Sequence, residues 1–93
     1  IANDIKQRAV KIIFSTRSNK EVIQYGASPR ASIGLLLASK ARALMQGRNH
    51  VSNEDLNTLA YPILRHRIIL NFEAERKGMS RDDAIKQILD KVK

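Results

Sequence analysis

Apolar residues recur every three or four positions in four segments of this chain, at about residues 2–17, from 29 to about 47, from 53 to 64 and from 81 to 92. This spacing places the apolar side chains on one face of an α-helix, so each segment predicts a helix packed on a common core. The sequence therefore predicts an all-α fold, a small bundle of about four helices.

Two shorter stretches add detail to this bundle. Val22, Ile23 and Tyr25 are typical of a short extended piece, and residues 65–77 are too apolar for a surface loop. Within that second stretch we expect residues 67–70 to be extended and 72–77 to form a helical turn. The fold thus has room for a very short strand pair.

Serine residues mark three of the expected helix starts. Ser52 with Asp55, and Ser80 with Asp83, resemble capping boxes, in which two side chains bond each other's backbone N–H groups. At the second helix we expect Ser28 as N-cap and Pro29 as the first helical residue, where its missing N–H is harmless. Pro62 predicts a kink in the third helix unless that helix stops early.

The helical spacing also predicts which side chains are buried. The second helix is expected to be the central and most buried one, and Leu37→Ala there is expected to cost roughly 2 to 5 kcal/mol. Gly34 inside it should cost roughly 1 kcal/mol relative to alanine, a weakness that we expect the fold to tolerate. The expected core consists of Ile5, Ala9, Val10, Ile12, Ile13 and Phe14 in the first helix; Ile33, Leu35, Leu36, Leu37, Ala38, Ala41, Leu44 and Met45 in the second; Leu56, Leu59, Ala60, Ile63 and Leu64 in the third; and Ile85, Ile88, Leu89 and Val92 in the last.

Length and composition bound the class of protein. With 93 residues the chain is expected to form one domain, residues 1–93, and its start at Ile1 rather than Met predicts a piece of a longer protein. The absence of cysteine excludes disulfides and thiolate chemistry and favours an intracellular, cytoplasmic setting. No apolar stretch approaches the roughly 20 residues that cross a bilayer, so no membrane contact is expected.

The chain is strongly basic, with a formal net charge of +8 and a pI near 10.3. Residues 26–50 hold four basic groups and no acid. Such a charge favours a polyanionic partner, which could be nucleic acid, anionic lipid, a phosphate ligand or an acidic protein.

Sequence motifs for catalysis are missing. The chain has no Gly-rich phosphate loop, no dinucleotide fingerprint and no zinc-like cluster, and His50 and His66 have no catalytic partner at a meaningful spacing. We therefore expect no catalytic activity and no metal site from these residues alone. The aromatic residues are not interleaved with basic clusters as base-stacking proteins require, so they are expected to fill core or interface: Phe14, Tyr25, Tyr61 and Phe72.

Arg30 is the residue with the best claim to chemistry. It lies in the expected first turn of the second helix, where the backbone already carries partial positive charge, so a cation there is favourable only beside an anion. An anion site and an incidental surface arginine are both compatible with Ser28-Pro29-Arg30. Gly26 and Ala27 just before it would let a flat ligand approach the backbone.

Several motifs together resemble the C-terminal lid domain of MoxR-type AAA+ ATPases. They are GASPRAS at residues 26–32, the apolar helix that follows, GR at 47–48 before VSNEDL at 51–56, and LRHRI at 64–68. The resemblance covers the chain from about Val22 to its end.

This resemblance implies specific roles. Arg30 would be the sensor 2 arginine that reaches the γ-phosphate of ATP, Gly26, Ala27, Ser28 and Pro29 would lie near the nucleotide, and the Mg²⁺ of the nucleotide would be bound by a core domain preceding residue 1. The implied function is to couple ATP binding and hydrolysis to lid motion in a chaperone-like remodelling ring. The implied partners are that core, neighbouring subunits of a hexamer, and a von Willebrand factor A domain protein.

Other interpretations remain open beside this one. A small basic helical nucleic-acid-binding domain fits the net charge, although acids at the start of the third helix disfavour it, and a plain interaction module is a third candidate. Arg65-His66-Arg67 could be a second anion contact, an inter-subunit contact or a basic surface strip beside a helix end, and the last is favoured.

Overall fold

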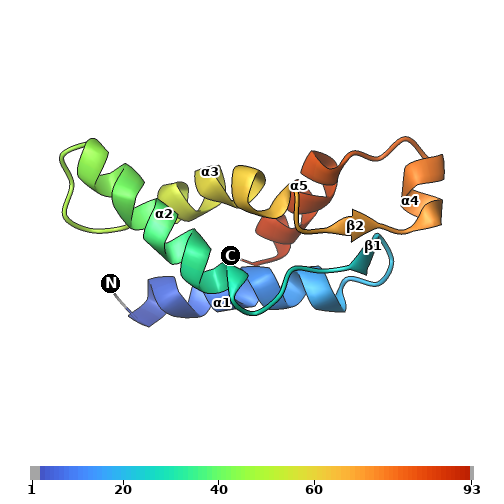
Figure 1. Cartoon of the computed structure of the whole chain (residues 1–93), viewed down its shortest axis with the longest axis horizontal. Coiled ribbons are helices and arrows are strands. Elements are labelled where there is room, and N and C mark those ends of the chain that lie inside the picture. Colours follow the sequence, from blue (N-terminus) through green and yellow to red (C-terminus); the bar gives the residue numbers. More distant parts are fainter. Residues whose placement is uncertain (1–2, 93) are drawn as a thin grey trace.

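The computed structural model describes residues 3–92 as an elongated helical domain of about 43 × 20 × 20 Å (Figure 1). Its elements are α1 Asn3–Ser18, β1 Ile23–Tyr25, α2 Ala31–Met45, α3 Asn53–Leu64, β2 Ile69–Leu70, α4 Phe72–Arg76 and α5 Arg81–Lys91. The predicted helical bundle with a short strand pair is confirmed, and α4 is the helical turn expected at 72–77. None of the helices in residues 3–92 combines the length and the hydropathy needed to cross a membrane.

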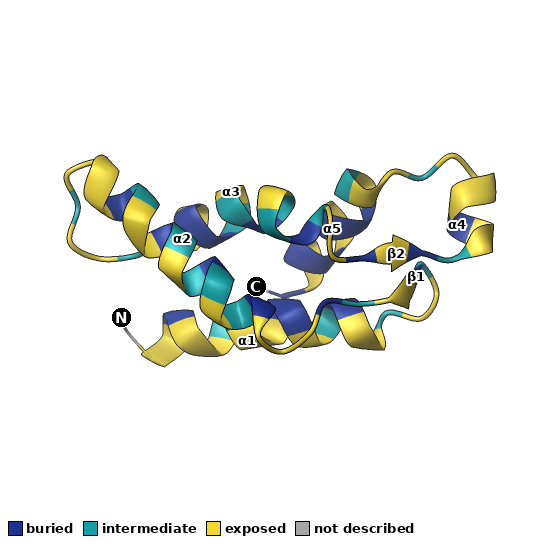
Figure 2. Cartoon of the chain, viewed as in Figure 1, coloured by how far each residue is buried: buried dark blue, intermediate teal, exposed yellow. Residues whose placement is uncertain are grey.

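The helices pack around one core. α2 and α3 form a helical hairpin with the most extensive contact in the domain, α1 runs below α2, and α5 packs on both α1 and α3 (Figure 1). In Figure 2 the buried surfaces of these helices face one another across the interior. The largest fully buried apolar side chains are Ile12, Ile23, Leu35, Leu56, Leu64, Ile68, Ile85 and Ile88.

The two short strands link the segment after α1 to the segment after α3. β1 and β2 pair antiparallel, with Ile23 opposite Leu70. Asn71 follows directly and accepts a hydrogen bond from the backbone N–H of Ala74 through its side-chain oxygen at 2.8 Å, which caps α4. The Asn71 amide nitrogen also donates to the carbonyls of Lys20 at 3.2 Å and Glu21 at 2.8 Å. One side chain therefore starts α4 and fixes it to the loop after α1.

Two predicted capping boxes are confirmed. The Ser52 backbone N–H donates to the Asp55 carboxylate at 2.8 Å while the Asp55 N–H donates to the Ser52 hydroxyl at 3.3 Å. Ser80 and Asp83 form the same reciprocal pair at 3.0 and 3.1 Å. Pro62 lies inside α3, which continues to its predicted end at Leu64, so the helix does not stop before the proline.

Most of the predicted buried face of α2 is wrong, although Leu35 is buried and Leu36 partly buried as expected. Ile33 and Leu37 are 60% and 63% exposed, and Met45 is 87% exposed. The buried face instead consists of Ala31, Leu35, Ser39 and Ala43. Three of these four side chains are small, and Leu35 is the large apolar one that enters the core. α2 therefore has a second apolar face, which points away from the core.

Other predicted core residues also lie on the surface. Val10 and Phe14 of α1 are 54% and 67% exposed, and Tyr25 and Phe72 are exposed as well, so these aromatic side chains do not fill the core. The face of α1 that is buried is the narrower predicted stripe, Ile5, Ala9, Ile12 and Ile13, extended by Thr16. For α3 and α5 the predicted apolar faces are confirmed as buried or partly buried.

Candidate functional site

The loop between β1 and α2 is held tightly against the end of α1. A Cβ placed on Gly26 would lie 2.4 Å from the carbonyl oxygen of Thr16, so glycine is required there by the neighbouring backbone. Ala27 is buried, and its N–H donates to the Thr16 hydroxyl at 2.9 Å. The Thr16 hydroxyl in turn donates to the Ile13 carbonyl at 2.6 Å. Residues 26 and 27 thus fix where α2 begins.

The start of α2 differs from the predicted cap. The helix begins at Ala31, and Arg30 has helical dihedral angles (φ −63°, ψ −23°) with no side-chain cap. The N–H of Ala31 donates at 2.9 Å to the Ser28 carbonyl rather than to its hydroxyl. Because the preceding residues already turn helically, their carbonyls satisfy the first N–H groups, and the predicted Ser28 N-cap is wrong.

Because of this turn, the first backbone N–H groups of α2 are not free to bind an anion. The N–H groups of Ser32 and Ile33 donate to the carbonyls of Pro29 and Arg30 at 3.2 and 3.1 Å. The backbone donors that a free helix start would offer to a ligand are therefore engaged. The exposed guanidinium of Arg30 is the group at this point of the fold that remains available for an anion.

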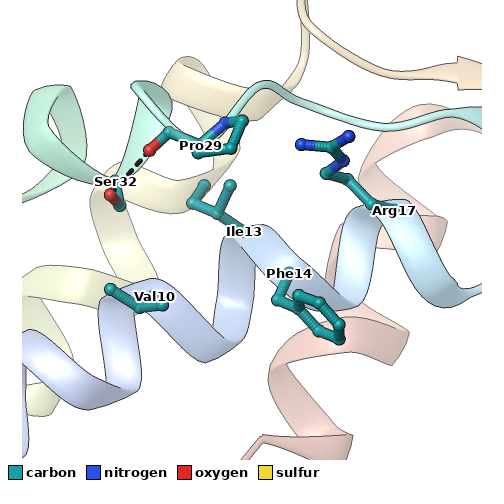
Figure 3. A pocket seen from close by; sticks show the side chains of 6 residues that line it. All are labelled: Val10, Ile13, Phe14, Arg17, Pro29 and Ser32. Atoms are coloured by element: carbon teal, nitrogen blue, oxygen red, sulfur yellow. Dashed lines mark hydrogen bonds between the residues drawn. The ribbon is translucent and has the colours of Figure 1, made fainter.

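Three cavities surround the loop. One, of about 480 Å³, is mostly apolar and lies between α1 and the start of α2 (Figure 3); it is lined by Val10, Ile13, Phe14, Arg17, Pro29 and Ser32. A second, of about 360 Å³, is lined by Arg17, Lys20, Gln24, Tyr25, Gly26, Ala27 and Ser28. The third, of about 260 Å³, is lined by Ser28, Arg30, Ala31, Gly34, Ile63 and Arg67. Every predicted site residue thus lines one of these cavities, and none of the cavities is lined by an acid.

The basic residues of the RHR motif have separate roles. Arg65 binds Asp82 with both groups of its fork, at 2.9 and 3.1 Å, which ties the end of α3 to the start of α5. This pairing lowers the pKa of Asp82 from its ordinary value and raises that of Arg65. His66 is exposed, and Arg67 lines the same cavity as Arg30. The favoured interpretation of Arg65-His66-Arg67 as a basic surface strip therefore does not describe Arg65, which is paired with Asp82.

Asp55 was predicted as a capping-box residue, but its burial between two arginines was not predicted. Its carboxylate is fully buried and binds Arg48 at 2.7 and 2.8 Å, and Arg42 also donates to it. The hydrogen bonds from Arg48, followed by those from Ser52 and Arg42, hold the pKa of Asp55 far below its ordinary value. The available signal was that no acid occurs between residues 22 and 53, so the acids at the start of α3 are the nearest counter-charges along the chain for the arginines at the end of α2.

Sequence and structure comparisons agree on the family. The family model described as "AAA lid domain" matches residues 15–88. The chain is 32% identical to Chaperone MoxR1 of Mycobacterium tuberculosis over 89% of its own length and 24% of that protein. It is 37% identical to the uncharacterized protein YeaC of Bacillus subtilis, over 98% of this chain and 28% of that one.

A solved structure supports the same assignment. The crystal structure of a candidate ATPase from Cytophaga hutchinsonii superposes with a TM-score of 0.90 at 40% identity, covering 99% of this chain and 30% of that one. The chain therefore spans between about a quarter and a third of the relatives that it matches. The chain belongs to the AAA lid domain family, which confirms the resemblance to the lid of MoxR-type AAA+ ATPases.

Proposed function

We propose that this domain is the nucleotide-sensing lid of a larger ATPase, in which Arg30 binds the γ-phosphate of ATP. The observation that carries the proposal is the position of Arg30: it is exposed at the start of α2 and, within residues 3–92, has no carboxylate within 4 Å. An exposed guanidinium without a carboxylate partner can bind an external anion. Phosphate is a suitable anion, because two of its oxygens can accept hydrogen bonds from the planar guanidinium at once.

The phosphate would come from a nucleotide held mainly by another domain. A nucleotide-binding core preceding residue 1 would hold ATP and its Mg²⁺, and the lid would close over it with the loop of residues 26–29 near the nucleotide. This part of the proposal rests on the family and on the share of each relative that the chain covers.

Hydrolysis would then change the position of the lid. The γ-phosphate carries the charge that Arg30 binds, so its loss on hydrolysis weakens the contact between lid and core. In a ring of such subunits, which we expect to be a hexamer, the movement would be passed to the neighbours and used for chaperone-like remodelling of another protein. A von Willebrand factor A domain protein is the expected partner in that process.

The test is Arg30→Ala in the full-length parent protein, with ATP hydrolysis and ADP binding measured separately. We expect hydrolysis to fall at least tenfold while ADP binding is retained, because the contact removed is specific for the terminal phosphate. Arg81→Ala is the matched control, since Arg81 is exposed at the start of α5 and forms no ion pair in the described part of the chain. Equal hydrolysis by all three proteins would refute the proposal.

A further inference from the structure

We infer that Arg67 is a second phosphate-binding residue, which acts with Arg30 on the terminal phosphate of the nucleotide. This inference rests on the proposed function and adds a residue to it. Arg30 belongs to the turn before α2, whereas Arg67 lies between α3 and β2, so the site is assembled from two distant parts of the chain. Both line the cavity of about 260 Å³ described above.

The lining of this cavity is the first argument. Its remaining residues are Ser28, Ala31, Gly34 and Ile63, none of which is charged. Two cations that share a small cavity without a counter-charge repel each other. An anion bound between them would remove that repulsion and accept hydrogen bonds from both guanidinium groups.

Four of the other arginines are paired with carboxylates, whereas Arg17 and Arg81 are exposed and form no ion pair within residues 3–92. Arg42 and Arg48 bind Asp55, Arg65 binds Asp82, and Arg76 binds Glu73. In contrast, within residues 3–92 no carboxylate lies within 4 Å of Arg67, although it is only two residues from the paired Arg65. The fold therefore neutralises Arg65 internally and leaves Arg67 for a partner outside the domain.

The backbone on both sides of Arg67 is fixed. Its own N–H donates to the Leu64 carbonyl at 2.9 Å, and the next residue, Ile68, is buried in the core. The pairing of Arg65 with Asp82 holds the preceding turn. A guanidinium on such a segment loses less conformational freedom on binding than one on a free loop, because its backbone is already ordered.

The cavity has room for a phosphate group beside α2. The glycine at position 34 leaves open space beside α2, where a Cβ would meet no atom within 4 Å. The first N–H groups of α2 are bonded to the preceding turn, so recognition here depends on the two arginine side chains. A tetrahedral phosphate offers enough oxygens for both forks at once.

The experiment compares Arg67→Ala, Arg67→Lys, Arg30→Ala and the double variant in the full-length parent. Titration calorimetry measures Kd for a non-hydrolysable ATP analogue and, separately, for ADP. We expect Arg67→Ala to weaken binding of the ATP analogue about tenfold and to change ADP binding less than twofold, because charge-assisted hydrogen bonds to the terminal phosphate are lost. Arg67→Lys should retain part of the affinity, since it keeps the charge but not the fork.

Each outcome separates this inference from the proposed function. If Arg30→Ala weakens analogue binding and Arg67→Ala does not, the inference is wrong and the proposed function stands. If neither variant has an effect, both are wrong. An equal loss of analogue and ADP affinity in Arg67→Ala would also overturn it, because the contact would then not be to the terminal phosphate. Arg81→Ala again serves as the control, and thermal unfolding verifies that each variant is folded.

Discussion

At the scale of single residues, Asp55 holds three parts of the domain together. Its carboxylate binds Arg42 near the end of α2, Arg48 in the loop that follows, and the N–H of Ser52 at the start of α3. Because the carboxylate is fully buried while both arginines are only partly exposed, the charges compensate one another inside the domain. The geometry of the α2–α3 hairpin therefore depends on this one side chain.

Replacing Asp55 tests that dependence. Asp55→Asn keeps the size of the side chain but leaves two arginines beside it without a counter-charge, so we expect the free energy of unfolding to fall by about 3 kcal/mol. Urea denaturation measures the change. Asp90→Asn is the control, because Asp90 is exposed on α5; a loss no larger than in this control would show that the cluster is not stabilising.

The same carboxylate makes stability depend on pH. The pKa of Asp55 is lowered in the folded state from its ordinary value of 3.8, so below about pH 4 the unfolded chain takes up a proton that the folded chain does not. Stability is therefore complete above that range and is lost as the pH falls. The lowered pKa of Asp82 acts in the same direction.

We expect urea midpoints at pH 7 and pH 3 to differ more for the wild type than for Asp55→Asn. The difference between the two proteins isolates the contribution of this group from that of the other carboxylates. An identical pH dependence would contradict the assignment.

At the scale of elements, α2 is the helix whose buried face could not be predicted from the sequence pattern. The boundaries of α3 and α5 follow from their capping boxes, and their buried faces from the 3.6-residue period, because polar residues cover their other sides. α2 instead carries apolar residues on nearly every side, so the period identifies a helix without identifying its buried face. The buried face, which consists of Ala31, Leu35, Ser39 and Ala43, is fixed by how α2 packs on α1 and α3.

Two leucines in α2 provide a matched test of the corrected face. Leu35 is fully buried, so Leu35→Ala should lower the free energy of unfolding by about 2 to 5 kcal/mol. Leu37 is 63% exposed, and Leu37→Ala should change it by less than about 0.5 kcal/mol. Equal effects in urea denaturation would show that the rotation of α2 differs from the one described.

Two glycines test the local geometry in the same way. Gly34→Ala places a methyl group in open space within a helix and should stabilise the domain by up to about 1 kcal/mol. Gly26→Ala places it against the backbone of Thr16 and Arg17, and should destabilise the domain by about 1 to 3 kcal/mol. Thermal unfolding shows whether each variant is more or less stable than the wild type. A Gly26→Ala protein as stable as the wild type would show that the loop can move away from α1.

The site was harder to predict than the helices. Arg30 follows from its place at a helix start together with the family resemblance, whereas the shared cavity of Arg30 and Arg67 depends on how α2 and the segment after α3 pack. The burial of Asp55 between two arginines is equally a tertiary feature. No spacing in the sequence encodes either contact, because the residues involved lie on different elements.

At the scale of the whole molecule, the start of α2 is surrounded by cavities that, on the proposed function, face the nucleotide-binding core. Arg30 and Arg67 line one cavity there. The apolar cavity shown in Figure 3 is lined by Phe14 and Pro29. A lid that offers only two arginines and no phosphate loop cannot provide most of the contacts to a nucleotide.

The isolated domain should therefore bind ATP weakly. Titration calorimetry of these 93 residues is expected to give no binding at micromolar ATP, because on the proposed function the main phosphate contacts would come from the core domain. A micromolar Kd for ATP would contradict the proposal that the core domain makes most of the contacts to the nucleotide. If the isolated domain instead shifts duplex DNA in a salt-dependent manner, the nucleic-acid-binding alternative gains support.

The stiffness of α2 has a mechanical consequence. Its 15 residues form a rod of about 22 Å between the turn at Arg30 and the region bound by Asp55. A tilt of about 10° at the Arg30 end displaces the opposite end by about 4 Å, roughly the width of a side chain. The Asp55 cluster, which bonds Arg42 near the end of α2 and Ser52 before α3, would carry that displacement to α3. On the proposed function, a slight change of angle beside the phosphate would therefore become a larger displacement at the far end of the domain.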